Sequence, residues 1–216
     1  MIVYEGKVFT DLPGVQGGGA AAPLGLGRYN ELLTGQLLPH FAEASLRGLI
    51  YTGCTASTGV APGTTIGTTA PFTLANPSGS GKVLVVLRMR CAYVSGTLGT
   101  GTTYLVANTN PAAAAVTGTA ITVTKTRLSS ASAAQGNVGL AFTTATLPAT
   151  PTLLKPVISL TPILATSVVA PYMLLNEVVD GSITIDPGCS LSFESAAAGG
   201  STPLVIFGAS WMELPV

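Results

Sequence analysis

The stretch GSITIDPGCSLSFES, residues 181–195, carries the clearest structural pattern in the chain. Isoleucines at positions 183 and 185 alternate with polar residues before the sequence Asp186-Pro187-Gly188, and leucine and phenylalanine alternate with polar residues at 191 and 193. An apolar residue at every second position is typical of a strand with one buried face. Asp-Pro-Gly is typical of a tight turn, because proline and glycine supply the backbone angles that a turn needs. The stretch therefore predicts a β-hairpin with strands at 182–185 and 190–195.

Similar strand-like segments follow one another from Leu49 to the end of the chain, separated by turn-forming stretches such as GVAPG (59–63) and NPSGSG (76–81). The expected strands are 49–52, 65–74, 83–94, 103–108, 120–127, 138–146, 157–165, 170–175, 182–185, 190–195 and 204–212. Many short strands with Gly/Pro-rich turns are typical of a sandwich or jelly roll. We expect residues 49–216 to form a single all-β domain, a jelly-roll-like sandwich.

The first 48 residues have a different character. Residues 1–27 begin with a strand-like segment (2–9) and continue as LPGVQGGGAAAPLGLG, which is too rich in Gly, Ala and Pro to bury a face of its own. Such a segment is either a mobile linker or an extended arm that becomes ordered against a neighbour. Residues 28–48 show apolar residues at helical spacing, interrupted by Gly35 and Pro39 and ended by Gly48. They predict a short helical element in two pieces.

The composition indicates a protein that packs against others. The chain has 216 residues and a net charge of zero, and only 8% of its residues are charged, against about 25% in an average soluble domain. A surface with so few charges is weakly repelled by its neighbours. We expect a subunit of a larger assembly.

The few charges are unevenly placed along the chain. No acidic residue lies between Glu43 and Glu177, and no basic residue follows Lys155. The basic residues between the two glutamates are Arg47, Lys82, Arg88, Arg90, Lys125, Arg127 and Lys155. The acids from Glu177 onward are Glu177, Asp180, Asp186, Glu194 and Glu213. The two groups either neutralise each other within one chain or pair between subunits. Dispersed cations without interleaved aromatic residues do not predict a nucleic-acid site.

Cysteine usage and hydropathy restrict the cellular setting. Cys54, Cys91 and Cys189 are widely spaced and odd in number, which argues against a disulfide framework or a zinc site and fits a reducing cytoplasm. The N-terminal sequence MIVYE has no positive or apolar region of an export signal. The mean hydropathy is high, +0.56. The most apolar region, 151–175, nevertheless contains four prolines and Lys155, so it predicts short extended segments and not a membrane span.

Sequences that resemble cofactor-binding motifs fail in detail. GSGK at 79–82 resembles the end of a phosphate-binding loop, but Asn76 replaces the first glycine and Val83 replaces the hydroxyl residue. An apolar run typical of a strand follows at 83–87, where a phosphate-binding loop would open a helix. GLGRYN at 25–30 lacks the third glycine of a dinucleotide fingerprint. We expect a turn at 76–81, and no cofactor.

No catalytic or metal-binding residue is predicted either. His40 is the single histidine, so it cannot form a metal cluster, and a position in the core or at an interface is the favoured interpretation. GASWM at 208–212 lacks the last glycine of a nucleophile elbow. Trp211 could serve as a sugar platform, but residues 207, 209 and 211 alternate as Phe, Ala and Trp, which favours a packed anchor.

Two pairs of carboxylates are candidates for a glycosidase centre. They are Glu177 with Asp180, and Asp186 with Glu194. Both pairs lie beside turns, where acidic residues commonly cap or solvate loops, so glycosidase chemistry is disfavoured. We expect a protein that is not an enzyme.

Several segments, in this order, resemble virion structural proteins of tailed bacteriophages. They are LLPHFAEASLRGLIYTG (37–53), PFTLANPSGSGKVLVVLRM (71–89), VSGTLGTGTTYLVANTNPAAAAVTGT (94–119), TLPATPTLL (146–154), DGSITIDPGCSLSF (180–193) and SWMELPV (210–216). The resemblance covers most of residues 32–216, and its motifs are structural, so no functional residue is carried over. It implies an oligomeric all-β protein associated with the capsid or the tail. The sequence departs from the family at Pro39-His40, where more polar helix residues are expected.

The leading hypothesis is therefore a capsid decoration (cement) or head-spike protein of the virion, assembled in the host cytoplasm. Its expected partners are two further copies of itself, in a homotrimer suggested by the three-fold positions of capsids, and the major capsid protein or another virion protein. Neither nucleic acid nor membrane is an expected partner. The alternative is a receptor-binding module of a tail or fibre.

Overall fold

The computed structural model describes residues 40–109, 115–128, 137–160, 173–197 and 199–216. The chain separates into two compact units, Met1–Phe41 and Ala42–Val216, and all described strands belong to the second. The expected arm (1–27) and most of the expected helical element (28–48) lie outside the described residues. Within 40–48 there is one helix, α1 (Ala42–Leu46), which has no buried residue and leaves Leu46 53% exposed. In this part, the apolar positions of the helical pattern do not form a core face.

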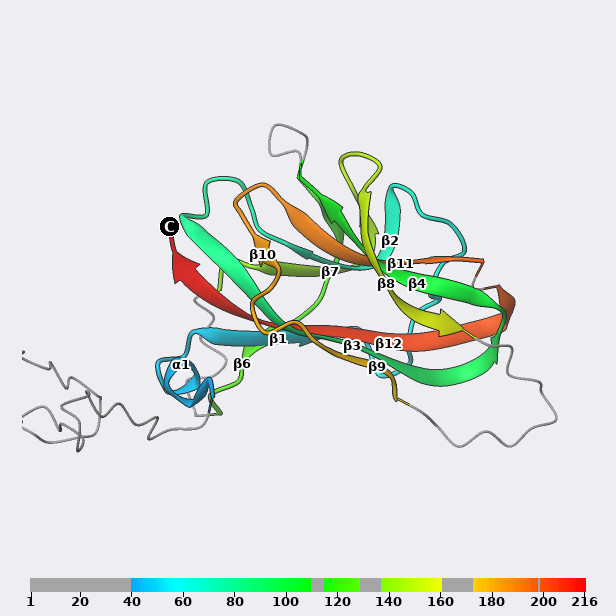
Figure 1. The fold of residues 1–216 in the computed structure, drawn as a ribbon, viewed down its shortest axis with the longest axis horizontal. Coiled ribbons are helices and arrows are strands. Elements are labelled where there is room, and N and C mark those ends of the chain that lie inside the picture. The colour runs from blue at the N-terminus through cyan, green and yellow to red at the C-terminus, as the bar shows by residue number, and fades with distance from the viewer. Residues whose placement is uncertain (1–39, 110–114, 129–136, 161–172, 198) are drawn as a thin grey trace, which may run out of the picture. The chain divides into compact units, whose positions relative to one another are not determined.

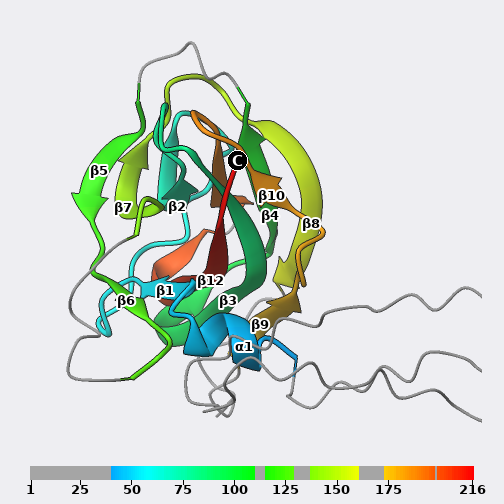
Figure 2. The ribbon, with the colours of Figure 1, turned by 90° about the vertical axis from the view of Figure 1, so that its left-hand side faces the viewer.

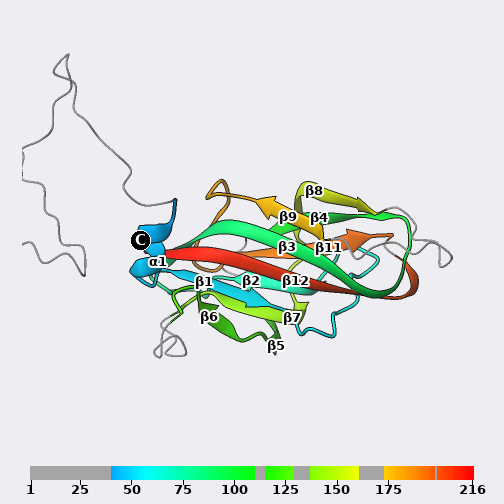
Figure 3. The ribbon, with the colours of Figure 1, turned by 90° about the horizontal axis from the view of Figure 1, so that it is seen from below.

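The unit Ala42–Val216 contains two antiparallel sheets packed face to face (Figures 1 and 3). Sheet I has the strand order β10-β3-β12-β1-β6, and β9 also pairs with β3. Its strands are β1 (Ile50–Cys54), β3 (Lys82–Leu98), β6 (Val123–Lys125), β9 (Met173–Val178), β10 (Thr184–Ile185) and β12 (Gly200–Pro215). Sheet II has the order β5-β7-β2-β11-β4-β8. Its strands are β2 (Thr69–Ala75), β4 (Gly101–Asn108), β5 (Thr117–Ala120), β7 (Leu140–Thr146), β8 (Thr152–Leu160) and β11 (Ser190–Ala196). The prediction of an all-β sandwich is confirmed.

The core lies between the two sheets. Phe72 and Phe193 of sheet II and Phe207 of sheet I are fully buried. The ring centroids of Phe193 and Phe207 are 4.9 Å apart, and those of Phe72 and Phe193 are 6.2 Å apart. Trp211 is also fully buried and stacks on Tyr51, with centroids 6.3 Å apart. The prediction that Trp211 is a packed anchor is confirmed, because alternate residues of β12 point into the core.

The hairpin predicted at 181–195 is wrong. β10 pairs with β3 in sheet I, whereas β11 pairs with β2 and β4 in sheet II, so the two segments belong to opposite layers. The turn itself is present, because the Cys189 N–H donates to the Asp186 carbonyl at 3.0 Å. Alternation shows which residues of each strand are buried, but it does not say whether both strands lie in the same sheet. The turn is a crossover between layers.

Asn76, directly after β2, holds this crossover in place. Its side-chain Nδ2 donates to the carbonyls of Lys82 and Ile185, each at 2.8 Å. Its backbone N–H donates to the Cys189 carbonyl at 3.0 Å, and its own carbonyl accepts from the Gly188 N–H at 2.8 Å. One buried amide thus joins the start of β3, the end of β10 and the turn before β11. The expected turn at 76–81 is also confirmed, with positive φ at glycines 79 and 81.

Two other expected strands differ from the structure. Of the strand expected at 120–127, only Val123–Lys125 forms a strand of its own, β6 of sheet I, and Ala120 is the last residue of β5 in sheet II. The strand expected at 157–165 begins earlier, at Thr152, because Pro156 lies within β8 and does not cap it. β8 is the end strand of sheet II, where a proline needs no partner for its missing N–H. β11 matches the strand expected at 190–195 closely, whereas β2 begins four residues later than the expected 65–74 and β12 extends the expected 204–212 at both ends.

The two layers meet at a corner built from glycine. The short connection from β3 to β4 lies against the connection from β11 to β12, and the Gly99 N–H donates to the Gly199 carbonyl. A Cβ on Gly99 would come within 2.1 Å of the Gly199 oxygen, and one on Gly200 within 1.9 Å of the Thr97 oxygen. The backbones approach too closely here for any side chain.

Replacing Asn76 by alanine is expected to lower the free energy of unfolding by about 1–3 kcal/mol. The buried Ile185 carbonyl would lose its side-chain donor, which costs roughly 1–3 kcal/mol, whereas the Lys82 carbonyl would keep its hydrogen bond from Ser80 Oγ at 3.2 Å. Asn176→Ala, at an exposed position of β9, is the matched control and should change stability by less than about 0.5 kcal/mol. Urea denaturation measures both, and equal effects of the two substitutions would contradict the role of Asn76.

Candidate functional site

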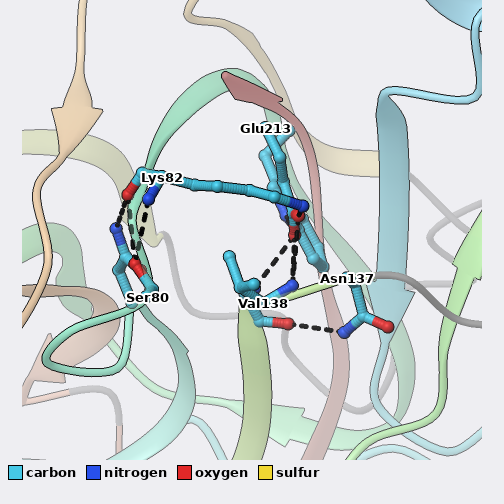
Figure 4. A network of polar contacts seen from close by, with 8 residues as sticks. Ser80, Lys82, Asn137, Val138 and Glu213 are labelled. Carbon is cyan, nitrogen blue, oxygen red and sulfur yellow. Dashed lines mark hydrogen bonds and ion pairs between the residues drawn. The ribbon is translucent and has the colours of Figure 1, made fainter. Parts of the chain in front are cut away.

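The carboxylate of Glu213 is the centre of a polar network that includes side chains and backbone amides (Figure 4). Glu213 lies near the end of β12 and is only 1% exposed. Its Oε1 accepts from the N–H groups of Val138 and Gly139 at 3.0 and 2.9 Å, and from Trp211 Nε1 at 3.2 Å. Its Oε2 accepts from Lys82 Nζ at 3.0 Å. Every oxygen of this buried anion therefore has a donor.

The network connects the two sheets. Glu213, Trp211 and Lys82 belong to β12 and β3 of sheet I, whereas Val138 and Gly139 lead directly into β7 of sheet II. The position of the acid follows from the same alternation that buries Trp211, because residues 211 and 213 lie on one face of the strand. The alternation of residues 211 and 213 therefore indicates a buried acid at position 213. It does not indicate which groups surround that acid.

The network accounts for part of the uneven charge pattern. Lys82 pairs with Glu213, and Lys155 of β8 pairs with Glu177 of β9. In both pairs a cation from the middle of the chain meets an acid from its last part, so pairing within one chain is confirmed for these four residues. Pairing between subunits stays a prediction.

Glu194 is a second buried carboxyl, with a different environment. It lies in β11 and is fully buried. Its Oε2 accepts from the Gly67 N–H at 2.7 Å, and its Oε1 has no partner among the residues that the structure describes. Burial raises the pKa of this carboxyl from 4.5 to about 7, and the hydrogen bond from Gly67 lowers it by less. Glu194 therefore changes charge near neutral pH inside the protein.

The carboxylate pairs considered as a glycosidase centre do not share an environment. Glu177 is bound by Lys155, and Glu194 is bound by the Gly67 N–H. Asp180 and Asp186 are exposed, at the turns on either side of β10. Each prospective pair is thus split between a bound acid and a solvated one.

His40 and the cysteines take unremarkable positions. His40 is exposed, and its ring lies edge-on to Phe41 with centroids 3.9 Å apart, so a core position is wrong and an interface position stays a prediction. The three cysteines are free thiols. Burial raises the pKa of the Cys91 thiol to about 12, and burial followed by the Asp186 charge raises that of Cys189. Within the described ranges no cluster of metal-ligating side chains is found.

A groove of about 620 Å³ lies beside β10; we call it the seam groove. Leu154 of β8, Ile183 and Ile185 beside and within β10, Leu191 of β11 and the turn residues Asp186 and Cys189 are among its lining residues. Its walls are mainly apolar, and its lining residues also include serines, threonines and one aspartate, Asp186. Sequence reasoning missed it, because it depends on β10 and β11 lying in different sheets.

Comparison with protein-family models, with curated proteins and with solved structures finds no match. In the parts of the chain that the structure describes, no helix has the length and apolar character to cross a lipid bilayer.

Glu213→Gln is expected to lower the free energy of unfolding by about 3–5 kcal/mol, because it leaves Lys82 without its buried anion and replaces an acceptor oxygen by a donor. The amides of Val138 and Gly139 should then exchange with solvent faster than in the unmodified protein. Glu43→Gln is the control, since Glu43 forms an exposed helical pair with Arg47 and should change stability by less than about 0.5 kcal/mol. Unchanged exchange at 138 and 139 would contradict the role of Glu213.

The buried Glu194 predicts that stability falls as pH rises. The folded state holds the proton up to about pH 7, whereas the unfolded chain releases it near 4.5. Because the folded state binds more protons between these values, the free energy of unfolding decreases across this window by roughly 3 kcal/mol. Glu194→Gln should remove that slope and be more stable than the unmodified protein above pH 7. Denaturation curves measured from pH 4 to pH 8 test this, with Glu43→Gln expected to keep the slope.

Proposed function

We propose that this chain is a non-enzymatic structural protein of a bacteriophage virion, a capsid decoration (cement) or head-spike protein. The observation that carries the proposal is the resemblance of its segments, in order, to virion structural proteins of tailed bacteriophages. The low charge of the chain supports it, because an assembly subunit gains from a surface that neighbouring copies do not repel. An antiparallel sandwich, here taken as jelly-roll-like, suits such a subunit.

The mechanism is the burial of uncharged surface between subunits and against the shell. The outward face of sheet I offers such a surface: by register, one row across it contains Thr124, Thr52, Ser210, Arg88 and Val178. Only one of these side chains is charged, and the hydroxyls of Thr52 and Ser210 already bond each other at 3.1 Å. Each 100 Å² of apolar area buried contributes about 2.5 kcal/mol before the cost of association.

The partners in this proposal are two further copies, forming a homotrimer, and the major capsid protein or another virion protein. The Gly-rich arm (1–27) acts as a docking strap along the shell, as segments of this composition wrap large surfaces. The protein lies on the virion surface after assembly in the host cytoplasm.

The seam groove favours one alternative function, a receptor-binding module of a tail or fibre. Binding of the purified protein to host cells would support this alternative.

Deletion of residues 1–27 is expected to leave a folded sandwich that no longer binds capsids. The core cluster is built from residues between Tyr51 and Trp211, so the deletion removes none of it. Sedimentation of capsids with each protein measures binding, and circular dichroism checks the fold. Undiminished binding by the shortened protein would remove the arm from the mechanism. The proposed function would be overturned if the purified protein were a monomer in solution and contacted no other protein in its native setting.

A further inference from the structure

One flank of the sandwich is an open seam between the end strands of the two sheets. β8 pairs only with β4, and β10 pairs only with β3, among the strands that the structure describes. The two strands lie on the same side of the sandwich, with β9 next to them (Figure 2). Farther along this flank, Lys155 of β8 and Glu177 of β9 join the sheets by an ion pair. The seam groove occupies the part of the flank beside β10, where the described residues form no such ion pair.

The first part of β8 is a site at which another strand can pair. The outer backbone groups of an end strand have no strand partner, and a peptide in extended conformation can bond to them. Leu153 and Leu154 are 48% and 47% exposed, so this part also presents apolar side chains. Pro156 cannot donate from its nitrogen, which limits pairing to residues 152–155. That is the part of β8 that reaches the seam groove through Leu154.

The chemistry of the groove favours a strand with apolar residues on one face and a cation near its edge. Leu154, Ile183 and Leu191 supply apolar walls. Asp186 at the rim is exposed, and no cation pairs with it among the described residues. A bound peptide would cover Leu154 and Ile183 and would place a cation beside the Asp186 carboxylate.

The sequence of the arm has this pattern. In MIVYEGKVF, residues Ile2, Tyr4 and Val8 alternate and would lie on one face of a strand. Lys7 is the only cation among residues 1–27. Eight residues of extended chain span about 26 Å, comparable with the nine residues of β8. Residues 10–27 then provide up to about 60 Å of extended chain, which is enough to reach another copy.

We propose that residues 2–9 of one copy bind in the seam groove of a second copy, as a strand added beside residues 152–155 with Lys7 next to Asp186. Each copy then offers a strand to one neighbour and receives one from another. Such a head-to-tail contact closes into a ring when the rotation between copies permits it, and a ring of three is the homotrimer of the proposed function. This inference concerns contacts between copies of the chain and does not require contact with a virion, so it can be tested separately from the proposed function.

Charge exchange in the full chain tests the proposal. Lys7→Glu and Asp186→Lys should each raise the concentration at which the assembly dissociates by tenfold or more, as light scattering measures over a dilution series. The combination of both substitutions should restore assembly to within about threefold. Asp180→Lys is the matched control, because Asp180 is exposed but does not line the groove. It should neither weaken assembly nor rescue Lys7→Glu. A combined variant no better than the single ones would overturn the pairing.

A cross-link locates the segment directly. In a Cys54→Ser background, Val8→Cys should form a disulfide with the native Cys189, which lines the groove, on mild oxidation at alkaline pH. Mixing isotopically labelled and unlabelled copies before oxidation should give mixed cross-linked pairs by mass spectrometry. Cys189→Ser should abolish the product. Cross-links confined to single chains, or a protein that stays monomeric at every concentration, would overturn the proposal. If the copies cross-link as expected but the protein does not bind capsids, only the proposed function is contradicted.

Discussion

A single buried carboxylate, that of Glu213, holds the two layers of this protein in register. An anion removed from water is tolerable only if its oxygens are fully supplied with donors. Here the donors come from both sheets, the lysine and indole from sheet I and two backbone amides from the approach to sheet II. A shift of either sheet by one residue would leave the charge unsatisfied. Apolar packing alone is less selective, since many arrangements of the same side chains bury similar area. Hydrophobic burial alone would allow several arrangements of the two sheets, and the hydrogen bonds of the carboxylate are satisfied in only one of them.

The sequence predicted the kind of fold and most strands, because alternation of apolar residues records which face of a strand is buried. Phe207 and Trp211 were assigned to the core on that basis, and both are there. The errors share one cause: pairing partners are not a local property. The segments around Asp186 looked like a hairpin, yet hydrogen bonds from the distant Asn76 place them in opposite layers. The seam groove follows from that placement, so it could not be read from the local pattern either. Glu194 was expected to cap or solvate a loop beside the turn, but it lies within β11 and is fully buried.

The scarcity of charge also has a structural meaning. Two of the ion pairs, those of Lys82 and Lys155, join segments that are far apart in the chain. The pair of Lys155 with Glu177 joins the two sheets directly, whereas Lys82 supports the Glu213 carboxylate, which accepts from amides that lead into sheet II. The outward row across sheet I that contains Thr52 and Ser210 carries one charged side chain, Arg88. Such a face is suited to close contact with a flat neighbour, since little charge must lose its hydration when it is covered.

The glycine corner gives the two ends of the sandwich different freedom to change over evolutionary time. Where the connections around Gly99 and Gly200 touch backbone to backbone, substitutions are sterically barred and an inserted residue would separate the layers. The opposite end, with the turns at 76–81 and 186–189, has open space around Gly79 and Gly81, although the positive φ of both residues favours glycine. An inserted residue there meets no backbone contact like that at Gly99 or Gly200, so related chains should vary in loop length at this end more than at the glycine corner.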